Sequence, residues 1–456
     1  MSGFEQHRDC VERALARARE TGADAADAVL VEGDSLEARV RGTEIDFVSQ
    51  AKERCLGVRA LVRDASSGGL RSAIASTTDL SADTILETAA QAVALAQHTA
   101  PDPHAGLPEE TPATGLPDLG LFDPSDRNVS VEARIEDARR AETAARAFDP
   151  RIENSEGSQA SSHFSNVTYG HSNGFLESYE SASHSIHSIP IARENGSMQR
   201  DIWFSAGRCL RELEDPAAVG RQAAERALRR LGSRQIPTCE APVIFDSGTA
   251  ASLVAQLASC LSGYSVYRKA SFLGESMGEN IAAASVTLID DGRKHGGLGS
   301  KPFDGEGLAT RRNVLVEGGR LSSWLLDSYS GRKLGLPSTG NASRSAGSAP
   351  GVAATNLWIE PGEASLGDLV AETKRGLLVT ELIGMGFNPV TGDYSRGAAG
   401  LWIENGEVAY PVEEITIAGN FLEMLRGIDG VGSEILWRGR IASPPLRIAA
   451  MQIAGA

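Results

Sequence analysis

The sequence has few cysteines, and their arrangement excludes a disulfide framework. Its 456 residues include five cysteines, an odd number, which lie far apart and are never spaced as C-x-x-C. Neither a set of disulfides nor a cysteine zinc site is therefore expected. No window approaches 18 apolar residues, and the N-terminal segment lacks the apolar core of a signal sequence. We expect a protein of the reducing cytoplasm that does not enter a membrane.

Positive charge is also scarce. The chain has 44 Lys and Arg residues against 60 Asp and Glu residues, a formal net charge of −16, and it contains no long basic run. Such a charge repels polyphosphates, so nucleic acid is not expected as a partner. The sequence also lacks the phosphate-binding motif G-x-x-x-x-G-K-[ST] and any strand–GxGxxG–helix unit, so a nucleotide cofactor has no support.

The histidines are placed in a way that excludes the common zinc-peptidase motifs. None of the eight is followed by glutamate, so H-E-x-x-H and H-E-x-x-x-H are both absent. After residue 260 the sequence has one histidine and no cysteine. A metal site in the second half would therefore have to use carboxylates and carbonyls. The acidic pairs there, Asp290-Asp291 and Glu413-Glu414, are interpreted as solvated turns.

The patterns that are present predict an α+β fold. A composition of 41% hydrophobic and 23% charged residues is that of an ordinary globular protein. Helical and β periods alternate in the first half, which indicates a curved antiparallel sheet with helices on one side. Helices are predicted near residues 4–20, 81–97, 130–148 and 216–231, and strands at 27–32, 35–42, 56–64 and through 151–207. In the second helix, Ser81 is the expected N-cap and Leu86 is expected to face inward.

The chain is expected to divide near residue 234. Residues 1–234 are predicted to form an N-terminal α+β domain, with an irregular Pro-rich connector at 99–127 that runs over the surface. Residues 235–456 hold most of the glycine-rich segments, which separate short β-like runs. They are predicted to form a mainly β, barrel-like C-terminal domain.

Two local patterns could carry chemistry in the first half. Residues 170–174 match G-x-S-x-G, but the following residues alternate like a strand instead of starting a helix, which favours a hairpin turn over a nucleophile elbow. A serine hydrolase that uses Ser172 with a remote histidine remains the alternative. His184 and His187 are three residues apart on a predicted strand, so they face opposite sides and cannot easily bind one metal. They are expected to be exposed or half-buried.

The segment GLLVTELIGMGFNPVTGDYSRGAAGLWIENGEVAYPVEEITIAGNFLEML (376–425) resembles the most characteristic stretch of the TldD/PmbA family. The segments STGNASRS (338–345) and EARVRGTEIDFVSQAKERCLGVRAL are similar to the same family, and the resemblance extends over essentially the whole length. The members of this family are metallopeptidases of the modulator-of-gyrase group, and the sequence of residues 376–425 is most similar to the PmbA branch, also called TldE.

The resemblance implies a heterodimer of two homologous subunits, TldD-like and TldE-like, which enclose a chamber for small or unfolded peptides. In the TldD branch, a helix early in the second half carries H-E-x-x-x-H, and a late cysteine completes the metal site. The matching segment here is SGTAASLVAQLASCLSG (247–263). Alignment places Val254 and Ala255 at the first His and the Glu, and Ser259 at the second His. A shift of one residue either way does not restore the motif.

We therefore expect a PmbA/TldE-like subunit of a heterodimeric TldD/TldE metallopeptidase that degrades or processes small unfolded peptides. This chain would bind no metal alone and have no catalytic residue, and a divalent metal, expected to be zinc, would lie in a TldD-like partner. Its role would be to complete the chamber and position substrate. Gly386, Tyr394 and Arg396 are the candidate lining residues, with an ordinary hairpin as the competing interpretation. The alternatives are the serine hydrolase above and a non-enzymatic binding homodimer.

Overall fold

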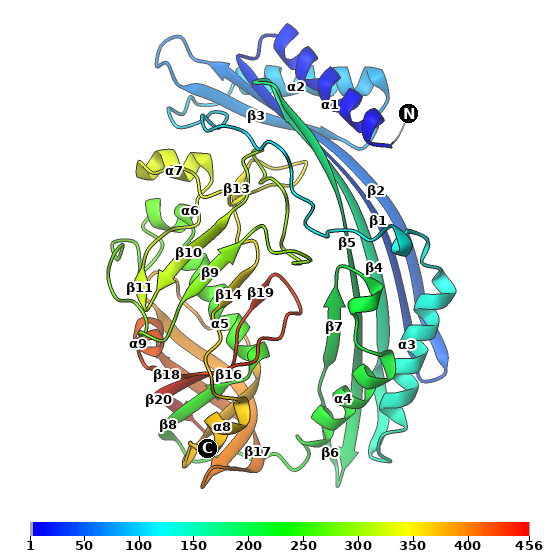
Figure 1. Ribbon diagram of the computed structural model, residues 1–456, viewed down its shortest axis with the longest axis vertical. Coiled ribbons are helices and arrows are strands. Elements are labelled where there is room, and N and C mark those ends of the chain that lie inside the picture. Colours follow the sequence, from blue (N-terminus) through cyan, green and yellow to red (C-terminus); the bar gives the residue numbers. More distant parts are fainter. Residues whose placement is uncertain (1–2, 456) are drawn as a thin grey trace.

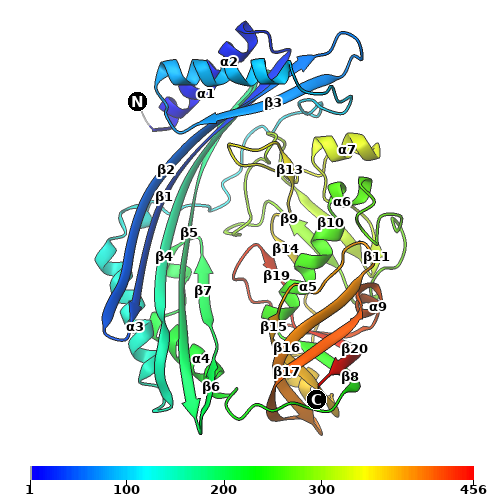
Figure 2. The same ribbon diagram turned by 180° about the vertical axis from the view of Figure 1, so that it is seen from behind.

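The computed structural model describes residues 3–455, and its N-terminal half is built on one long antiparallel sheet. The strands lie in the order β3-β2-β1-β4-β5-β6, and β7 also pairs with β5. Their bounds are β1 (Ala25–Arg41), β2 (Glu44–Arg63), β3 (Leu70–Thr77), β4 (Ile152–His171), β5 (Phe175–Glu194), β6 (Ser197–Arg200) and β7 (Trp203–Gly207). The sheet bends into an arc whose concave face is turned towards the C-terminal half, as the two opposite views show (Figures 1 and 2).

The segments predicted as two strands, 27–32 and 35–42, form the single strand β1, so that prediction is wrong in this detail. Gly33 and Asp34 continue the ladder opposite Glu53 and Lys52, and Lys52 pairs with Asp34 at 3.1 Å. A Gly-Asp pair in the middle of a strand resembles a turn in sequence, but here the cross-strand partners hold it extended. The turn comes instead at Gly42, which adopts a positive φ of 63°.

Helices cover the convex face of this sheet. They are α1 (Gly3–Glu20), α2 (Ala82–Ala96), α3 (Val131–Arg146) and α4 (Pro216–Leu228), and two short 3₁₀ turns, η1 (Pro124–Asn128) and η2 (Leu210–Glu212), join them to the strands. Small side chains allow close contact: a Cβ at Gly220 of α4 would lie 2.0 Å from the Ala141 carbonyl oxygen of α3. In α2, Ile85 is buried and Leu86 is 37% exposed, so the predicted inward position of Leu86 is wrong. Ser81 is the N-cap residue, but its side chain makes no capping hydrogen bond.

The C-terminal half contains a closed five-stranded barrel, which together with the curved sheet confirms the predicted α+β class. Its strands lie in the order β17-β16-β15-β8-β20, and β17 pairs with β20 to close it. The bounds are β8 (Cys239–Phe245), β15 (Arg375–Ile383), β16 (Asp393–Glu404), β17 (Glu407–Asn420) and β20 (Leu446–Ala454), with β18 (Ile428–Val431) attached to β20. The helix α5 (Ser247–Cys260) follows β8 directly and packs its apolar side into the core of this half.

A second sheet and several short helices complete this half. The sheet has the order β11-β10-β9-β14-β19. Its strands are β9 (Leu288–Asp291), β10 (Arg312–Glu317), β11 (Arg320–Leu321), β14 (Leu357–Ile359) and β19 (Ile441–Ala442), and β12 (Ala342–Ser343) pairs separately with β13 (Gly351–Val352). The helices are α6 (Gly263–Tyr267), α7 (Ser328–Leu334), α8 (Leu366–Ala371) and α9 (Phe421–Arg426). Across residues 3–455, no helix is both long and apolar enough to cross a membrane.

The connector at 99–127 is irregular as predicted, but it does not simply run over the surface. It passes between the curved sheet and the C-terminal half (Figure 1), where Leu107, Leu119 and Leu121 are buried. The Leu121 carbonyl accepts a hydrogen bond from the Ala182 N–H of β5, and the Leu119 carbonyl accepts one from the Gly296 N–H. A segment without periodicity can be buried when its backbone groups find such partners on both sides. The division of the chain at residue 234 stays a prediction.

A buried charge cluster also joins the two halves. Asp27 of β1 is fully buried and accepts hydrogen bonds from Arg59 of β2 and from Arg344 of the C-terminal half, the latter at 2.5 Å. Burial alone would raise the pKa of Asp27, but the guanidinium groups of Arg344 and Arg59 outweigh it and hold that pKa below its ordinary value. The cluster therefore keeps an ionised carboxylate inside the protein at neutral pH.

Candidate functional site

The helix α5 is the element on which relatives of the TldD type would carry their metal ligands. Asp246 begins it as N-cap and accepts a hydrogen bond from the Thr249 N–H at 2.8 Å. Val254 is 1% exposed and packs in the core, whereas Ala255 and Ser259 lie on the exposed side of the helix. The Ser259 hydroxyl donates to the Gln256 carbonyl at 2.6 Å. These positions therefore serve packing and local hydrogen bonding.

The residues on α5 do not fit a catalytic metal. Val254 and Ala255 offer no ligand atom, and the hydroxyl of Ser259 is a poor ligand for the zinc that such sites hold. The four residues before α5 and the helix itself also contain no histidine. No hydrolytic step through a metal can be built on this helix.

The three candidate lining residues lie in different surroundings. Gly386 is in the exposed loop after β15, and its carbonyl accepts a hydrogen bond from the Ser395 N–H at 2.7 Å. Tyr394 is 2% exposed and stacks against Phe421 with ring centroids 6.2 Å apart, and burial raises its pKa to about 12. Arg396, two residues further along β16, lines a cavity. Their contact with a substrate stays a prediction, although only Arg396 reaches a cavity wall.

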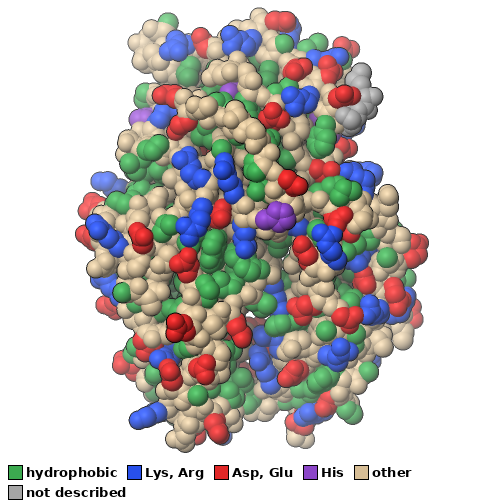
Figure 3. Space-filling view, viewed as in Figure 1, with side chains coloured by type: hydrophobic (Ala, Val, Ile, Leu, Met, Phe, Trp, Pro, Cys, Tyr) green, Lys and Arg blue, Asp and Glu red, His purple; other side chains and the backbone are tan. Residues whose placement is uncertain are grey.

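That cavity lies between the halves of the molecule and has a volume of about 660 Å³. Its walls come from the end of α4, the segment joining β6 to β7, the first turns of α5, strand β15, Arg396 of β16 and residues 434–438. Blue Lys and Arg side chains line the groove between the two halves in the lower part of the space-filling view (Figure 3). Since the walls come from both halves, the cavity depends on how they pack together. We refer to it below as the arginine cavity.

The second cavity lies beside the Asp27 cluster and is smaller, about 320 Å³. Tyr169 and Tyr179 of the curved sheet and Phe303 and Arg344 of the C-terminal half contribute to its walls. Arg208 also lines it, and its buried guanidinium donates to carbonyl oxygens on both halves. Arg208 therefore joins the two halves beside this cavity.

The concave face of the sheet between the cavities is polar. Tyr169 and Tyr179 point towards the C-terminal half, and side chains alternate along a strand, so the residues at every second position share that face. On β4 and β5 these are mostly small and polar, namely Ser161, His163, Ser165, Ser181, Ser183, Ser185 and His187. β7 pairs only with β5 among the described strands, which leaves its other edge without a strand partner. The face can therefore offer hydrogen bonds to an extended chain.

The G-x-S-x-G segment forms a hairpin turn, which confirms that interpretation. β4 ends at His171, β5 begins opposite it at Phe175, and no helix follows. The Ser172 hydroxyl accepts a hydrogen bond from the Ala26 N–H at 3.1 Å, and no described histidine side chain hydrogen-bonds to it. Without a base to remove its proton, this hydroxyl lacks the activation that a serine nucleophile needs.

His184 and His187 lie on opposite faces of β5, as predicted, but the expected exposure of His184 is wrong. It is 1% exposed, its Nδ1 lies 2.9 Å from the Ser162 hydroxyl, and burial lowers its pKa to about 4. Serine-rich alternation favoured a solvated strand, yet α3, α4 and η1 cover this face. His184 is therefore a neutral core residue at physiological pH.

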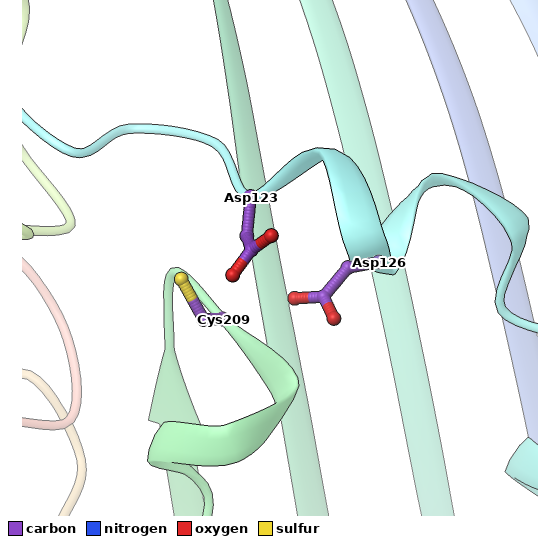
Figure 4. A group of neighbouring side chains, drawn as sticks. All are labelled: Asp123, Asp126 and Cys209. Carbon is purple, nitrogen blue, oxygen red and sulfur yellow. The ribbon is translucent and has the colours of Figure 1, made fainter.

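Next to His184 lie Asp123, Asp126 and Cys209, whose potential ligand atoms are within 4.8 Å of one another (Figure 4). Other groups already use the two carboxylates. Asp123 caps η1 and pairs with Arg211, and Asp126 accepts a hydrogen bond from the Leu210 N–H at 2.9 Å. Burial also raises the pKa of the Cys209 thiol, which opposes the thiolate that a metal requires. The group is better explained as a junction of turns than as a metal site.

Asp290 is the clearest residue that the sequence analysis placed wrongly. It is fully buried in β9, where its carboxylate accepts hydrogen bonds from the Thr355 N–H at 2.6 Å and the Asn341 amide at 2.6 Å. Burial raises its pKa to about 6 despite these bonds. The β-like run SVTLID, which ends at Asp290 itself, was the available signal, because a strand that leads into an Asp-Asp pair can carry its first carboxylate into the core.

Comparison with known proteins gives a consistent family along the whole chain. Three family models match: PmbA/TldA metallopeptidase domain 1 at residues 26–96, its central domain at 124–231 and its C-terminal domain at 238–455. The curated metalloprotease PmbA of Escherichia coli O157:H7 is 40% identical over 460 aligned residues, which cover 100% of this chain and 98% of that protein.

Solved structures agree in fold. A candidate modulator of DNA gyrase from Bacteroides thetaiotaomicron has a TM-score of 0.89 and 25% identity, with 98% of each chain covered. TldE from Thermococcus kodakarensis has a TM-score of 0.87 over 97% of this chain and 99% of its own, and at 24% identity it supports the fold alone. The matched family models and the 40% identity show that this chain belongs to the PmbA/TldD family of metallopeptidases, in its PmbA/TldE branch.

Proposed function

We propose that this chain is the non-catalytic, TldE-like subunit of a two-chain peptidase. The observation that carries the proposal is the state of α5. The family fold is present over the full length, while Val254, Ala255 and Ser259 stand where ligands and a general base would be. Without a metal to lower the pKa of a bound water and without an adjacent base, peptide hydrolysis lacks its two main sources of rate enhancement.

The partner in this proposal is a homologous TldD-like chain of the cytoplasm that contributes the metal, expected to be zinc. The present chain would close the peptide chamber and hold the substrate. The polar concave face and the unpaired edge of β7 support that role, because an extended peptide can add to a sheet edge through main-chain hydrogen bonds. Such binding places few demands on side chains, which suits small or unfolded peptides of varied sequence.

The test measures peptidase activity and metal content in the same samples. The isolated chain should not cleave an unstructured fluorogenic peptide and should hold no stoichiometric zinc. Mixing it with a TldD-like protein that carries H-E-x-x-x-H should give an activity that a chelator removes and that exceeds the activity of that protein alone. The Ser172→Ala variant should behave as the original chain does, since Ser172 serves only the turn.

Each other outcome identifies a different function. Chelator-resistant cleavage by the isolated chain that Ser172→Ala abolishes would establish the serine hydrolase. A stable homodimer that ignores the TldD-like protein and changes no activity would establish a binding protein. Stoichiometric zinc in the isolated, active chain would contradict the proposal directly.

A further inference from the structure

The arginine cavity has an excess of positive charge in a protein that is strongly negative overall. Six arginines and four carboxylates line it, whereas the whole chain carries a net charge of −16. The arginines are Arg200, Arg226, Arg229, Arg230, Arg396 and Arg438, and the acids are Asp201, Asp246, Glu381 and Glu434. A local positive excess of this kind attracts anions and focuses them into a cleft.

Part of this charge is neutralised within the protein. Arg226 lies 3.2 Å from Asp201 and 3.8 Å from Asp246, and Arg230 pairs with Glu381 at 2.5 Å. These pairs account for three of the four carboxylates on the wall, and Arg438 instead pairs at 3.5 Å with Glu214, which lies outside the wall. The remaining acid, Glu434, is exposed.

Arg200 pairs with Glu156 at 3.1 Å, also outside the wall, so two of the six wall arginines have no ion-pair partner among residues 3–455. The Arg229 guanidinium makes no ion pair and no hydrogen bond, and its Nε and Nη2 are buried. Arg396 has a buried Nε without a partner; its Nη1 lies 3.5 Å from the Ser252 hydroxyl, and its guanidinium also interacts with the Tyr394 hydroxyl. Burial, together with nearby Arg226, lowers the pKa of Arg229 and outweighs the opposing effect of Asp201 and Asp246. Both side chains are half-buried, and desolvation of a charge without an ion-pair partner costs stability, so these two groups are not explained by folding.

The start of α5 adds to the same field. Ser247 and Gly248 in its first turn line the cavity, and α5 is 14 residues long. The N-cap Asp246 accepts a hydrogen bond from the Thr249 N–H, whereas the N–H groups of the two residues before Thr249 have no partner within the helix. The N-terminal end of a helix dipole stabilises an anion placed there.

Apolar side chains also line the cavity, chiefly Ile202, Trp203, Phe204, Leu378, Leu382 and Ile435. The Arg438 guanidinium lies 3.4 Å from the centroid of the Trp203 ring, so charged and apolar groups are in contact here. Trp203 and Phe204 belong to β7, the strand with an unpaired edge. A volume of about 660 Å³ lies within the usual range of roughly 300–1,000 Å³ for small-ligand sites. The cavity thus combines arginines without ion-pair partners, apolar side chains and residues of β7, a strand with one unpaired edge.

We propose that the arginine cavity binds the C-terminal carboxylate of a peptide, with Arg229 and Arg396 as its partners and the apolar residues of the cavity holding the last side chains. A free carboxylate joined to an apolar chain matches all three features, and Arg recognises carboxylates through paired N–H donors. The proposal deepens the proposed function by naming the end of the peptide that this subunit holds. The binding itself requires no partner chain.

The experiment compares two forms of one peptide on the purified full-length chain. A fluorescent pentapeptide that ends in Leu-Phe is titrated as the free acid and as the C-terminal amide, and binding is followed by anisotropy. We expect the acid to bind at least about tenfold more tightly than the amide, since the loss of a charge-assisted partner in a buried site costs at least that much. Arg229→Gln and Arg396→Gln should each weaken binding of the acid by about tenfold and leave the amide unaffected.

The matched control is Arg221→Gln, because Arg221 is also on α4 but is exposed and away from the cavity wall. It should bind both peptides as the original chain does. Urea unfolding of every variant checks that the fold is kept. Inorganic phosphate and acetate serve as competitors, and millimolar acetate should displace the acid peptide partially.

Equal affinity for acid and amide would overturn the proposal, as would no detectable binding or variants that bind like the original chain. Binding of phosphate without binding of the acid peptide would likewise refute a peptide carboxylate site. These results do not depend on the peptidase assay. Absence of carboxylate selectivity together with intact two-chain peptidase activity would refute only the proposed carboxylate site. Carboxylate selectivity without two-chain activity would refute only the proposed function.

Discussion

Replacing Asp27 with Asn should destabilise the protein severely, because Asp27 is the only carboxylate that Arg59 and Arg344 pair with among the described residues. Asp27 is fully buried, and the side chains of Arg344 and Arg59 are 2% and 9% exposed. Asn has nearly the same shape, so the variant removes the negative charge and leaves two buried guanidinium groups without a counter-charge.

The expected cost follows from that geometry. Removing one partner of a buried ion pair costs about 3–5 kcal/mol, because the remaining charge stays desolvated. Domains are commonly stable by about 5–15 kcal/mol, so this is a large fraction of the total. Asp34→Asn is the matched control on the same strand. Its pair with Lys52 is 3.1 Å long but exposed, with 73% of the Lys52 side chain accessible, and such pairs contribute about 0–1 kcal/mol.

The measurement is urea unfolding followed by tryptophan fluorescence and circular dichroism, at several pH values. Since the folded pKa of Asp27 lies below its ordinary value, the stability that it contributes is present above about pH 4 and is lost as the pH falls through the folded pKa. The difference between the original chain and Asp27→Asn should therefore shrink in acid. Equal, small losses for Asp27→Asn and Asp34→Asn at pH 7 would refute the reasoning.

Three further outcomes are expected. Ser172→Ala should lower stability by about 1 kcal/mol or less, seen as a small shift of the urea midpoint, because it removes one acceptor of the Ala26 N–H. Glu306→Gln should flatten the dependence of stability on pH, because burial and nearby Asp304 raise the pKa of Glu306 in the folded protein. The original chain should therefore lose stability as the pH rises from 4.5, by at most about 1.4 kcal/mol per pH unit, and the variant should lose less. A chelator should leave the melting temperature of the isolated chain unchanged, since Asp123 already binds Arg211 and a backbone N–H; a clear decrease would indicate a bound metal.

Elements with a clear local period were predictable, and those held by distant partners were not. The helix α3 has an apolar period and a serine N-cap, and it was found within two residues of its ends. The turn at 172–174 followed from the strand pattern after it. The prediction for the central part of β1 was wrong because Gly33 and Asp34 are typical of a turn unless Glu53 and Lys52 are known to lie opposite them. The prediction for Asp290 was wrong because the hydrogen-bond donors to its carboxylate lie more than 50 residues away in the sequence.

The proposed absence of a metal site rests on a local sequence motif, whereas the arginine cavity could not be predicted from the sequence. Arg229, Arg396 and Arg438 come from the end of α4, from β16 and from a loop before β19, and more than 200 residues separate the first from the last. No spacing rule connects them, and the overall charge of −16 pointed away from an anion site. Only packing of the two halves shows that the arginines meet.

The two findings about α5 support one another. A subunit kept only as a scaffold would be more stable with neutral side chains at 229 and 396, since neither guanidinium forms an ion pair among the described residues. The same helix that lacks ligands at 254 and 259 places its N-terminus at the wall beside these arginines. Arginines without ion-pair partners at a cavity are expected where a protein binds an anionic ligand. A helix without metal-ligating side chains is expected where a subunit does not cleave peptides. Together they favour a subunit that holds a peptide for chemistry performed elsewhere.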